Sequence, residues 1–311
     1  MAKRRQNRGR DIHGILLLDK PAGVTSNGAL QMVKKMFAAA KAGHTGSLDP
    51  LATGMLPICF GEATKFSQFL LDADKSYRVT AKLGVTTETG DADGEVVETR
   101  PVSVTEARLL EVVERYLGDI EQIPSMYSAI KHQGTPLYKL ARQGIEVERK
   151  PRPVTIHRLE LLRLEGDEME LEVDCTKGTY IRTLVEDIGA DLGCGAHVTV
   201  LRRLSAGPYP AERMLTLEQL GEIKDAGGFE AIDEKLLPLS TAVADWPRAE
   251  LGDNAAWYII QGQPVMADSR PRGGWVSIYQ ASSGEFLGVG EVLEDGRIAP
   301  RRLVKQGGPR P

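Results

Sequence analysis

The sequence predicts a chain of mixed α and β structure that ends in a small β domain, and three patterns support this. Residues 77–85, YRVTAKLGV, alternate between apolar and polar side chains, which is typical of a strand with one buried face. Residues 181–192 repeat apolar side chains at helical spacing. Beyond residue 248, the short runs WVSIYQ, GEFLGVGEV and GRIAPRRLV are separated by Ser-Ser-Gly and Glu-Asp-Gly turns, which predicts a compact β domain.

The first elements of the chain lead to an unusual loop. Residues 14–23, GILLLDKPAG, form an apolar run that ends in a turn, as a buried strand would. A helix is then expected, with Ser26 as its N-cap and Gly43 at its end. The octapeptide GHTGSLDP, residues 43–50, is therefore predicted to be a loop after a helix, presenting the carboxylate of Asp49.

The later elements alternate between helix and strand. The pattern predicts a helix over 61–72, a helix over 105–117 behind a capping box of Ser103 and Glu106, a strand over 169–176, and a short helix over 216–224 capped by Thr216 with Gln219.

Composition excludes several classes of protein. The 311 residues carry a net charge of −4, so a nucleic acid would have to meet a local basic patch rather than the surface as a whole. No run approaches the roughly 20 apolar residues of a membrane helix, and no secretory signal is present, so a cytoplasmic location is expected. The three cysteines, Cys59, Cys175 and Cys194, support neither a disulfide framework nor a zinc site.

Two basic segments are candidates for binding RNA. Residues 1–10 hold five cations and no acid, so this arm either contacts phosphates or is a solvated tail. Residues 122–152 break the pattern of apolar runs, and their charges are mostly positive. An RNA-binding insertion and an ordinary surface loop are equally compatible with this composition. Its cations and aromatic side chains are Lys131, Lys139, Arg142, Arg149, Lys150, Arg152, Tyr127, His132 and Tyr138.

Asp49 by itself is weak evidence, because aspartate is a common turn residue. The longer string GHTGSLDPLATGMLPICFGEATK changes this, since it follows LLLDKPAG and precedes KSYRV and CTKGTYIRTL. These motifs closely resemble those of pseudouridine synthases of the TruB family. IPSMYSAIKHQGTPLYKLARQG and GTYIRTLVEDIGADLGCGAHVTVLRRL fit the same family. The resemblance extends from Asp11 to Arg213, and more faintly through the last 60 residues, which are similar to a PUA domain.

The resemblance implies a fold and a division into domains. The fold would be α+β, with a largely antiparallel central sheet, flanking helices and a small C-terminal PUA-like β domain. The arm would cover 1–10, the catalytic domain 11–247 with the RNA-binding insertion at about 122–152, and the PUA-like domain 248–311.

The resemblance also implies an activity, which is the isomerisation of one uridine, position 55 in the T-loop of tRNA, to pseudouridine. Because reactant and product are isomers, no cofactor or metal is expected, and the sequence has no phosphate-binding glycine motif or metal cluster. The partner would be tRNA, with no membrane and no required protein. Two alternatives remain open: modification of another RNA such as ribosomal RNA, and a main role as an RNA-folding protein.

By resemblance, three residues carry the chemistry. Asp49 would be the catalytic nucleophile or base, Arg182 would orient it and lower its pKa, and Tyr77 would stack on the base after the uridine swings out of the RNA. Without the motif, Tyr77 would be assigned to the core and Arg182 to the surface. Whether Asp49 attacks the uracil ring or the sugar carbon, or removes a sugar proton, is left open.

By the same resemblance, the remaining candidates are expected to bind the substrate or support the catalytic loop. His44 is expected to contact RNA rather than transfer a proton, and Tyr180 and Leu201 are expected to contact the uridine. Lys20, with Pro21, is expected to pack near the catalytic loop. Lys131 and Arg142 of the insertion would bind phosphates. The structural alternatives for these residues are strand-end packing, core filling and turn formation.

Overall fold

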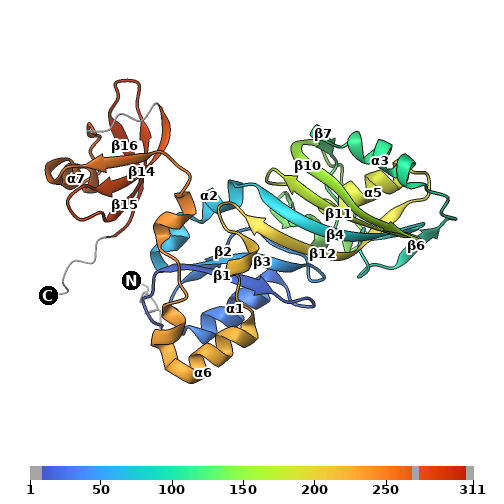
Figure 1. Ribbon diagram of the computed structural model, residues 1–311, viewed down its shortest axis with the longest axis horizontal. Helices are drawn as coiled ribbons and strands as arrows, with labels where there is room; N and C mark the ends of the chain where they lie inside the picture. Colours follow the sequence, from blue (N-terminus) through green and yellow to red (C-terminus); the bar gives the residue numbers. More distant parts are fainter. Residues whose placement is uncertain (1–8, 268–272, 306–311) are drawn as a thin grey trace.

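The computed structural model describes residues 9–267 and 273–305, so residues 1–8 of the basic arm lie outside the described residues. Figure 1 shows a long sheet with helices packed against it and a smaller β domain, coloured orange to red, at one end. The last residue of the arm, Arg10, is ion-paired with Asp233 and lies 4.3 Å from the ring centre of Phe229, so it is held against a helix.

The helices are α1 (Ser26–Met36), α2 (Ser67–Asp72), α3 (Glu106–Glu114), α4 (Leu137–Ala141), α5 (Ile181–Asp191), α6 (Leu217–Asp233) and α7 (Asp253–Ile260). The strands of the large sheet are β1 (Gly14–Lys20), β2 (Ala42–His44), β3 (Thr53–Phe60), β4 (Lys75–Leu83), β7 (Gly118–Gln122), β10 (Arg152–Glu165), β11 (Glu168–Cys175) and β12 (Ala196–Ala206). The smaller sheets use β5 (Val85–Thr87), β6 (Val96–Thr99), β8 (Lys131–His132), β9 (Thr135–Pro136), β13 (Arg248–Leu251), β14 (Gly274–Gln280), β15 (Phe286–Val292) and β16 (Ile298–Leu303).

The large sheet has the strand order β1-β3-β12-β4-β11-β10-β7, with β2 added beside β3. All these pairs are antiparallel except β3 with β12. The predicted α+β class with a largely antiparallel sheet is therefore confirmed.

Strand β12 joins the two halves of the sheet. Its residue Arg203 lies opposite Gly54 of β3 on one side and opposite Tyr77 of β4 on the other. Gly54 has a φ of +97°, and a Cβ there would lie 2.2 Å from the carbonyl oxygen of Arg203, so a side chain is excluded. This close approach brings the loop between β2 and β3 next to the start of β4.

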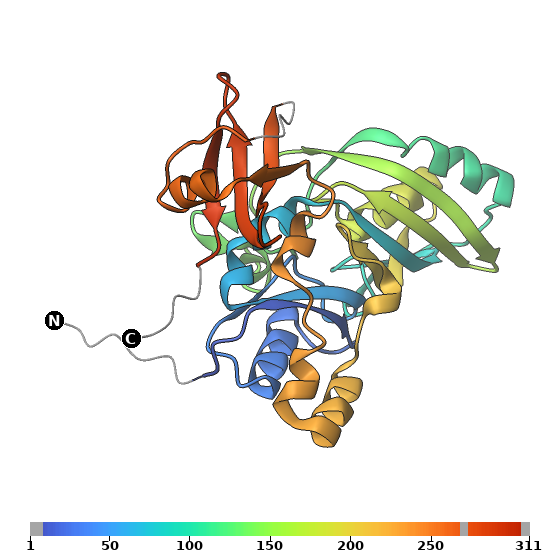
Figure 2. The same cartoon turned by 60° about the vertical axis from the view of Figure 1, so that its left-hand side comes forward.

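The helices divide the core into separate clusters. Helices α1 and α6 bury Leu30, Val33 and Leu220 against one face of β1 and β3. Helices α3 and α5 cover β4, β10, β11 and β12 at the other end of the sheet, which agrees with both views in Figures 1 and 2. Because α5 is buried along most of its length, its first turn is fixed relative to the sheet.

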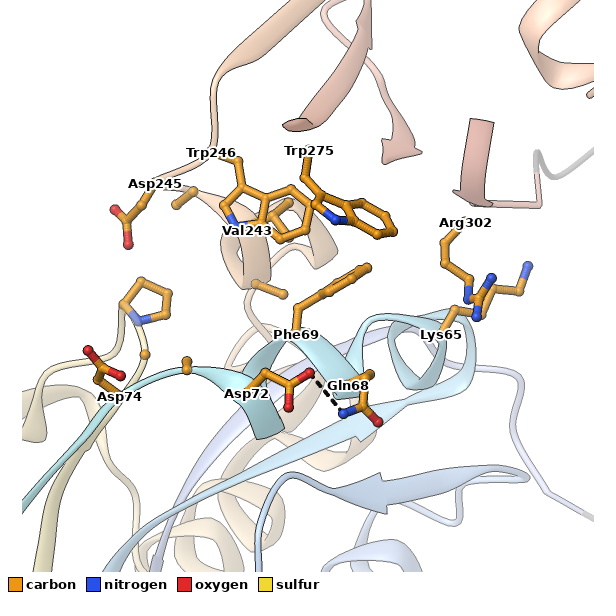
Figure 3. Close-up of a pocket in the computed structure, with 15 residues that line it drawn as sticks. Lys65, Gln68, Phe69, Asp72, Asp74, Val243, Asp245, Trp246, Trp275 and Arg302 are labelled. Carbon is orange, nitrogen blue, oxygen red and sulfur yellow. Dashed lines mark hydrogen bonds between the residues drawn. The ribbon is translucent and has the colours of Figure 1, made fainter. Parts of the chain in front are cut away.

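The small β domain packs on α2 through aromatic side chains (Figure 3). The ring centre of Phe69 lies 4.8 Å from that of Trp246 and 5.4 Å from that of Trp275. A second contact joins Phe66 to Phe286, with ring centres 5.5 Å apart. A cavity of about 730 Å³ remains beside these rings.

Several predicted element boundaries are wrong. The N-cap of α1 is Thr25 rather than Ser26, and α1 ends at Met36, well before Gly43. The octapeptide 43–50 is not entirely loop, because Gly43 and His44 belong to β2.

Other corrections concern later helices. The N-cap of α3 is Thr105, so the proposed capping box of Ser103 and Glu106 does not form, and α3 ends at Glu114 rather than at 117. The predicted helix over 61–72 is a 3-10 turn followed by α2. The capping box of Thr216 with Gln219 is confirmed. Gly228, non-helical at a φ of +69°, marks a kink within α6, beyond which a second helical stretch continues to Asp233.

Candidate active site

The loop that carries Asp49 is tied down from several sides. The Ser26 hydroxyl accepts a hydrogen bond from the backbone N–H of Leu48 at 2.7 Å and donates to the Leu48 carbonyl at 3.0 Å. Lys20, at the end of β1, donates to the carbonyl of Pro50 at 3.3 Å. With the loop fixed in this way, 42% of the Asp49 side chain remains exposed.

Arg182 is the ion-pair partner of Asp49. It is the second residue of α5, its side chain is 6% exposed, and its Nε lies 2.9 Å from a carboxylate oxygen of Asp49. The guanidinium also donates to the carbonyl of Thr89 at 2.5 Å and to that of Tyr127 at 2.8 Å. A planar guanidinium fixed at three points holds the carboxylate in one orientation.

A second carboxylate, Asp91, lies behind this pair. Its oxygen is 3.6 Å from Nε of Arg182, and its side chain is 7% exposed. The carbonyl of Asp91 also accepts a hydrogen bond from the Thr87 hydroxyl at 2.7 Å. Asp91 was not found from the sequence, because an aspartate in a Gly-Asp-Ala-Asp-Gly run is typical of a solvated turn.

The electrostatics of Asp49 differ from the expectation. Burial raises the pKa of Asp49, and the negative charge of Asp91 raises it too, while Arg182 and Lys20 lower it. The net direction is upward, because removal of water from around the carboxylate outweighs the arginine. Arg182 does lower the pKa of Asp49, as predicted, but burial and Asp91 outweigh it, so the pKa is raised overall.

Asp49 opens into a cavity of about 310 Å³. Tyr77, Tyr180 and Leu201 line it together with Asp49 and Arg182, so the structure brings these five predicted residues into one site. Tyr77 is 8% exposed and lies on the buried face of β4, so its ring forms a wall of the cavity. Burial raises the pKa of Tyr77, which keeps its hydroxyl neutral.

The other predicted residues lie around this cavity. His44 and Arg142 line an adjoining cavity of about 670 Å³, which also reaches Asp49. Burial lowers the pKa of His44, and the charge of Arg203 lowers it further, which favours a neutral ring that recognises a ligand. Lys20 is fully buried beneath the loop and does not line either cavity, whereas Lys131 lies farther off, in the two-stranded sheet β8–β9.

Two buried cations in the wall of the site were missed. Lys75 and Arg203 both line the cavity with Asp49, and they are 7% and 1% exposed. The alternation of β4 contains the signal for Lys75, because Lys75 shares the buried phase of Tyr77 and Val79. A charged side chain at a position where the strand pattern expects an apolar one indicates either that the strand is assigned wrongly or that the charge has a special role.

The chemistry of the site involves a carboxylate, an arginine and aromatic walls. In residues 9–267 and 273–305, no group of three or more His, Cys, Asp or Glu side chains is placed to hold a metal ion, and all three cysteines are free and buried. No helix in this part of the chain is long and apolar enough to cross a membrane.

Comparison with known families decides which family this chain belongs to. Residues 34–181 match the profile of the TruB family pseudouridylate synthase N-terminal domain, and residues 182–244 match that of the tRNA pseudouridylate synthase B C-terminal domain. Residues 247–304 match the profile "Pseudouridine synthase II TruB, C-terminal". The chain belongs to the TruB family.

Similar proteins extend this result over the whole chain. The tRNA pseudouridine synthase B of Tolumonas auensis is 56% identical over 100% of this chain and 98% of its own length. That of Aeromonas salmonicida is 58% identical, with 98% of each chain covered. The TruB family membership therefore includes the C-terminal β domain.

Solved structures show the same fold. A Cbf5-Nop10-Gar1 complex contains a chain with a TM-score of 0.74 and 29% identity, covering 94% of this chain and 84% of that one. An H/ACA RNP bound to a substrate RNA containing 2′-deoxyuridine gives a TM-score of 0.73 at 25% identity, covering 98% and 92%.

Proposed function

We propose that this TruB-family chain isomerises uridine 55 in the T-loop of tRNA to pseudouridine, with Asp49 as the catalytic carboxylate. The observation that carries the proposal is the ion pair of Asp49 with the buried Arg182, in a cavity walled by Tyr77. The identity of 56% to a tRNA pseudouridine synthase B over the full chain supports tRNA as the substrate.

The cavity fits the steps that the reaction needs. The target base must leave the RNA stack, and the exposed part of Asp49 shows that the carboxylate is reachable from outside. The ring of Tyr77 and the apolar side chain of Leu201 offer faces against which a pyrimidine can lie. Asp49 then assists cleavage of the glycosidic bond, the uracil turns over, and carbon 5 joins the ribose.

Each supporting residue has a separate role in this proposal. Arg182 fixes the Asp49 carboxylate and keeps a positive charge beside it. Tyr180 and Leu201 contact the uridine, His44 and Arg142 contact the RNA at the mouth of the site, and Lys20 holds the loop through the Pro50 carbonyl. Lys131 contributes to phosphate binding from the insertion. The chain needs no cofactor for this isomerisation, acts in the cytoplasm and requires no protein partner.

A purified protein and an unmodified tRNA transcript test the proposal. Asp49→Asn removes the negative charge while preserving the shape of the side chain, so it should abolish isomerisation and leave tRNA affinity within about tenfold, or about 1.4 kcal/mol. Pseudouridine is mapped by carbodiimide adducts and primer extension, because the isomerisation leaves the mass unchanged.

The control is Asp167→Asn, which changes an exposed carboxylate in the turn between β10 and β11 and should retain full turnover. Normal turnover by Asp49→Asn would show that Asp49 is not the catalytic carboxylate. Salt-sensitive tRNA binding without any pseudouridine, in the wild-type protein as well, would favour another RNA substrate or an RNA-folding role.

A further inference from the structure

Two buried cations line the active-site cavity without a carboxylate to neutralise them. Lys75 and Arg203 form no ion pair in the part of the chain that the structure describes, although buried lysine and arginine side chains are almost always paired. Instead, Lys75 donates to the carbonyl of Leu71 at 2.7 Å, and Arg203 donates to that of Met55 at 2.6 Å.

The charges around the cavity do not balance. Arg182 is a third cation in the lining, and among the described residues that line the cavity the one carboxylate is Asp49. Asp91 and Glu186 interact with Arg182 but do not line this cavity. Burial lowers the pKa of Lys75 to about 8, and repulsion by the charge of Arg203 contributes to that fall.

Neighbouring acids do not cancel this excess. Asp72 and Asp74 attract Lys75 only at longer range, and each has another partner: Asp72 lies 2.8 Å from Lys177, and Asp74 lies 3.1 Å from His157. An excess of buried positive charge is costly to fold, so it is expected where an anion is bound or formed during the reaction.

A structural role explains part of the arrangement. Lys75 caps the C-terminal end of α2 by donating to the carbonyls of Leu70, Leu71 and Ala73. Arg203 donates to Gly46 at 3.2 Å and so ties the catalytic loop to β12. Neutral donors would also satisfy these carbonyls, so the hydrogen bonds do not account for two full charges beside the cavity.

The position of these charges indicates which anion they serve. Arg203 lies opposite Tyr77 in the sheet, and its charge acts on the Tyr77 hydroxyl. Lys75 lies two residues before Tyr77 on the same buried face of β4, so both cations line the cavity beside the ring on which a flipped base would lie. A phosphodiester of the RNA backbone would instead meet exposed groups such as Arg142, which lines the adjoining cavity.

The chemistry requires an anion at this wall. When the bond between C1′ and N1 breaks, its electron pair leaves with the pyrimidine ring. After the ring turns, a pair at C5 forms the bond to C1′, the C5 proton leaves and N1 gains a proton, so the atoms balance without a co-reactant. Addition of Asp49 to the ring would also place negative charge on the ring, so each possible path passes through a ring with excess negative charge.

We propose that Lys75 and Arg203 stabilise the negative charge that develops on the uracil ring before its new bond to the ribose forms. This deepens the proposed function and rests on it. Fixed charges in a site sheltered from water stabilise a developing charge far more strongly than charges in bulk water do. Because these charges act on the ring only during the reaction, their loss should slow the chemical step more than it weakens tRNA binding.

Single-turnover rates with saturating enzyme test the proposal on two tRNAs, one with uridine and one with 5-fluorouridine at the target position. The rate is measured as the disappearance of the N-linked nucleoside with time, determined after nuclease digestion of the tRNA. Fluorine withdraws electrons and stabilises a ring anion by itself, so the enzyme's charges should matter less. We expect the single-turnover rates of Lys75→Met and Arg203→Met to fall at least 100-fold on the tRNA with uridine. On the tRNA with 5-fluorouridine, the fold loss of rate should be at least ten times smaller.

Charge-preserving and neighbouring variants provide the controls. Lys75→Arg and Arg203→Lys should retain most of the rate that the methionine variants lose. Arg202→Gln changes the adjacent arginine, which points elsewhere and pairs with Asp19 at 2.7 Å, and should stay within threefold of wild type on both substrates. If Lys75→Met does not fold, Lys75→Gln removes the charge while keeping a donor for the α2 carbonyls.

The outcomes separate the possibilities. Equal losses on the two substrates, or losses as large with the charge-preserving variants, would assign Lys75 and Arg203 a purely structural role and overturn the proposal. A loss confined to tRNA affinity would assign them to phosphate binding and overturn it as well. Absence of pseudouridine with the wild-type protein would instead refute the proposed function.

Discussion

At the scale of single residues, Asp49 shows how burial and pairing compete. The salt bridge to Arg182 at 2.9 Å favours the ionised carboxylate, but the surrounding protein and Asp91 favour the protonated form. The net effect raises the pKa of Asp49 above its usual value. A more basic carboxylate is a better nucleophile or proton acceptor, so the penalty of burial is useful in this site.

This raised pKa predicts the pH dependence of the reaction. The single-turnover rate should fall on acidification as Asp49 becomes protonated, and the fall should begin at a higher pH than for an ordinary aspartate. Asp91→Asn removes one cause of the shift, so the acid limb should move to lower pH. A pH–rate profile of both proteins measures this, and an acid limb that stays in place or moves upward would contradict the electrostatic account.

At the scale of elements, the insertion is linked directly to the catalytic arginine. The segment between β7 and β10 supplies the Tyr127 carbonyl that binds Arg182 at 2.8 Å. Ser128 and Ala129 of the same segment line the cavity. The part of the chain predicted to bind RNA therefore also forms one wall of the site. Its cations Lys131, Lys139 and Arg142 are exposed, as phosphate contacts must be.

Removal of these cations should weaken tRNA binding through the loss of counterion release. Replacing Lys131, Lys139 and Arg142 together by Ala should flatten the slope of log affinity against log salt by about two to three units, since each phosphate contact contributes about 0.7 to 0.9. Binding titrations at several salt concentrations measure the slope. Arg108→Ala on α3 is the control. An unchanged salt slope in the triple variant would show that the insertion is an ordinary surface loop.

At the scale of the whole molecule, the contact between α2 and the C-terminal domain joins that domain to the large sheet. The rings of Phe69, Trp246 and Trp275 meet at this contact (Figure 3). Hydrogen bonds reinforce it: Lys65 donates to the Leu303 carbonyl at 3.0 Å, and Glu62 accepts from the backbone N–H of Lys305 at 2.8 Å. These bonds join the 3-10 turn before α2 to the end of β16. The junction therefore combines packing with directional hydrogen bonds.

Phe69→Ala should loosen this junction. The ring touches both tryptophans, so its loss should cost about 1 to 3 kcal/mol of the free energy of unfolding and speed proteolytic cleavage near residues 244–248. Thermal unfolding and limited proteolysis measure the two effects. Tyr258→Ala, on the exposed face of α7, is the matched control. Equal cleavage of the two variants would show that the hydrogen bonds alone hold the domains together.

The sequence by itself determined the elements whose patterns are local. The alternation of 77–85 placed Tyr77 on a buried face, the helical stripe of 181–192 located α5, and the turn residues separated the strands of the small domain. The quoted motifs led to Asp49 and Arg182 because their residue types and order are specific to one family. Boundaries such as the N-caps at Thr25 and Thr105 were less accurate, since neighbouring serines and threonines can each serve as a cap.

Only the tertiary structure decided which charges share the site. Asp91, Lys75 and Arg203 lie in segments whose local patterns are those of a turn and two strands. The alternation of β4 could indicate that Lys75 is buried, but no local pattern indicates that these three residues meet Asp49 and Arg182. Their burial arises when β12 pairs with β3 and β4 at once and α5 packs behind them. The pKa of Asp49 follows from that arrangement, because desolvation and charge depend on distances in space rather than along the chain.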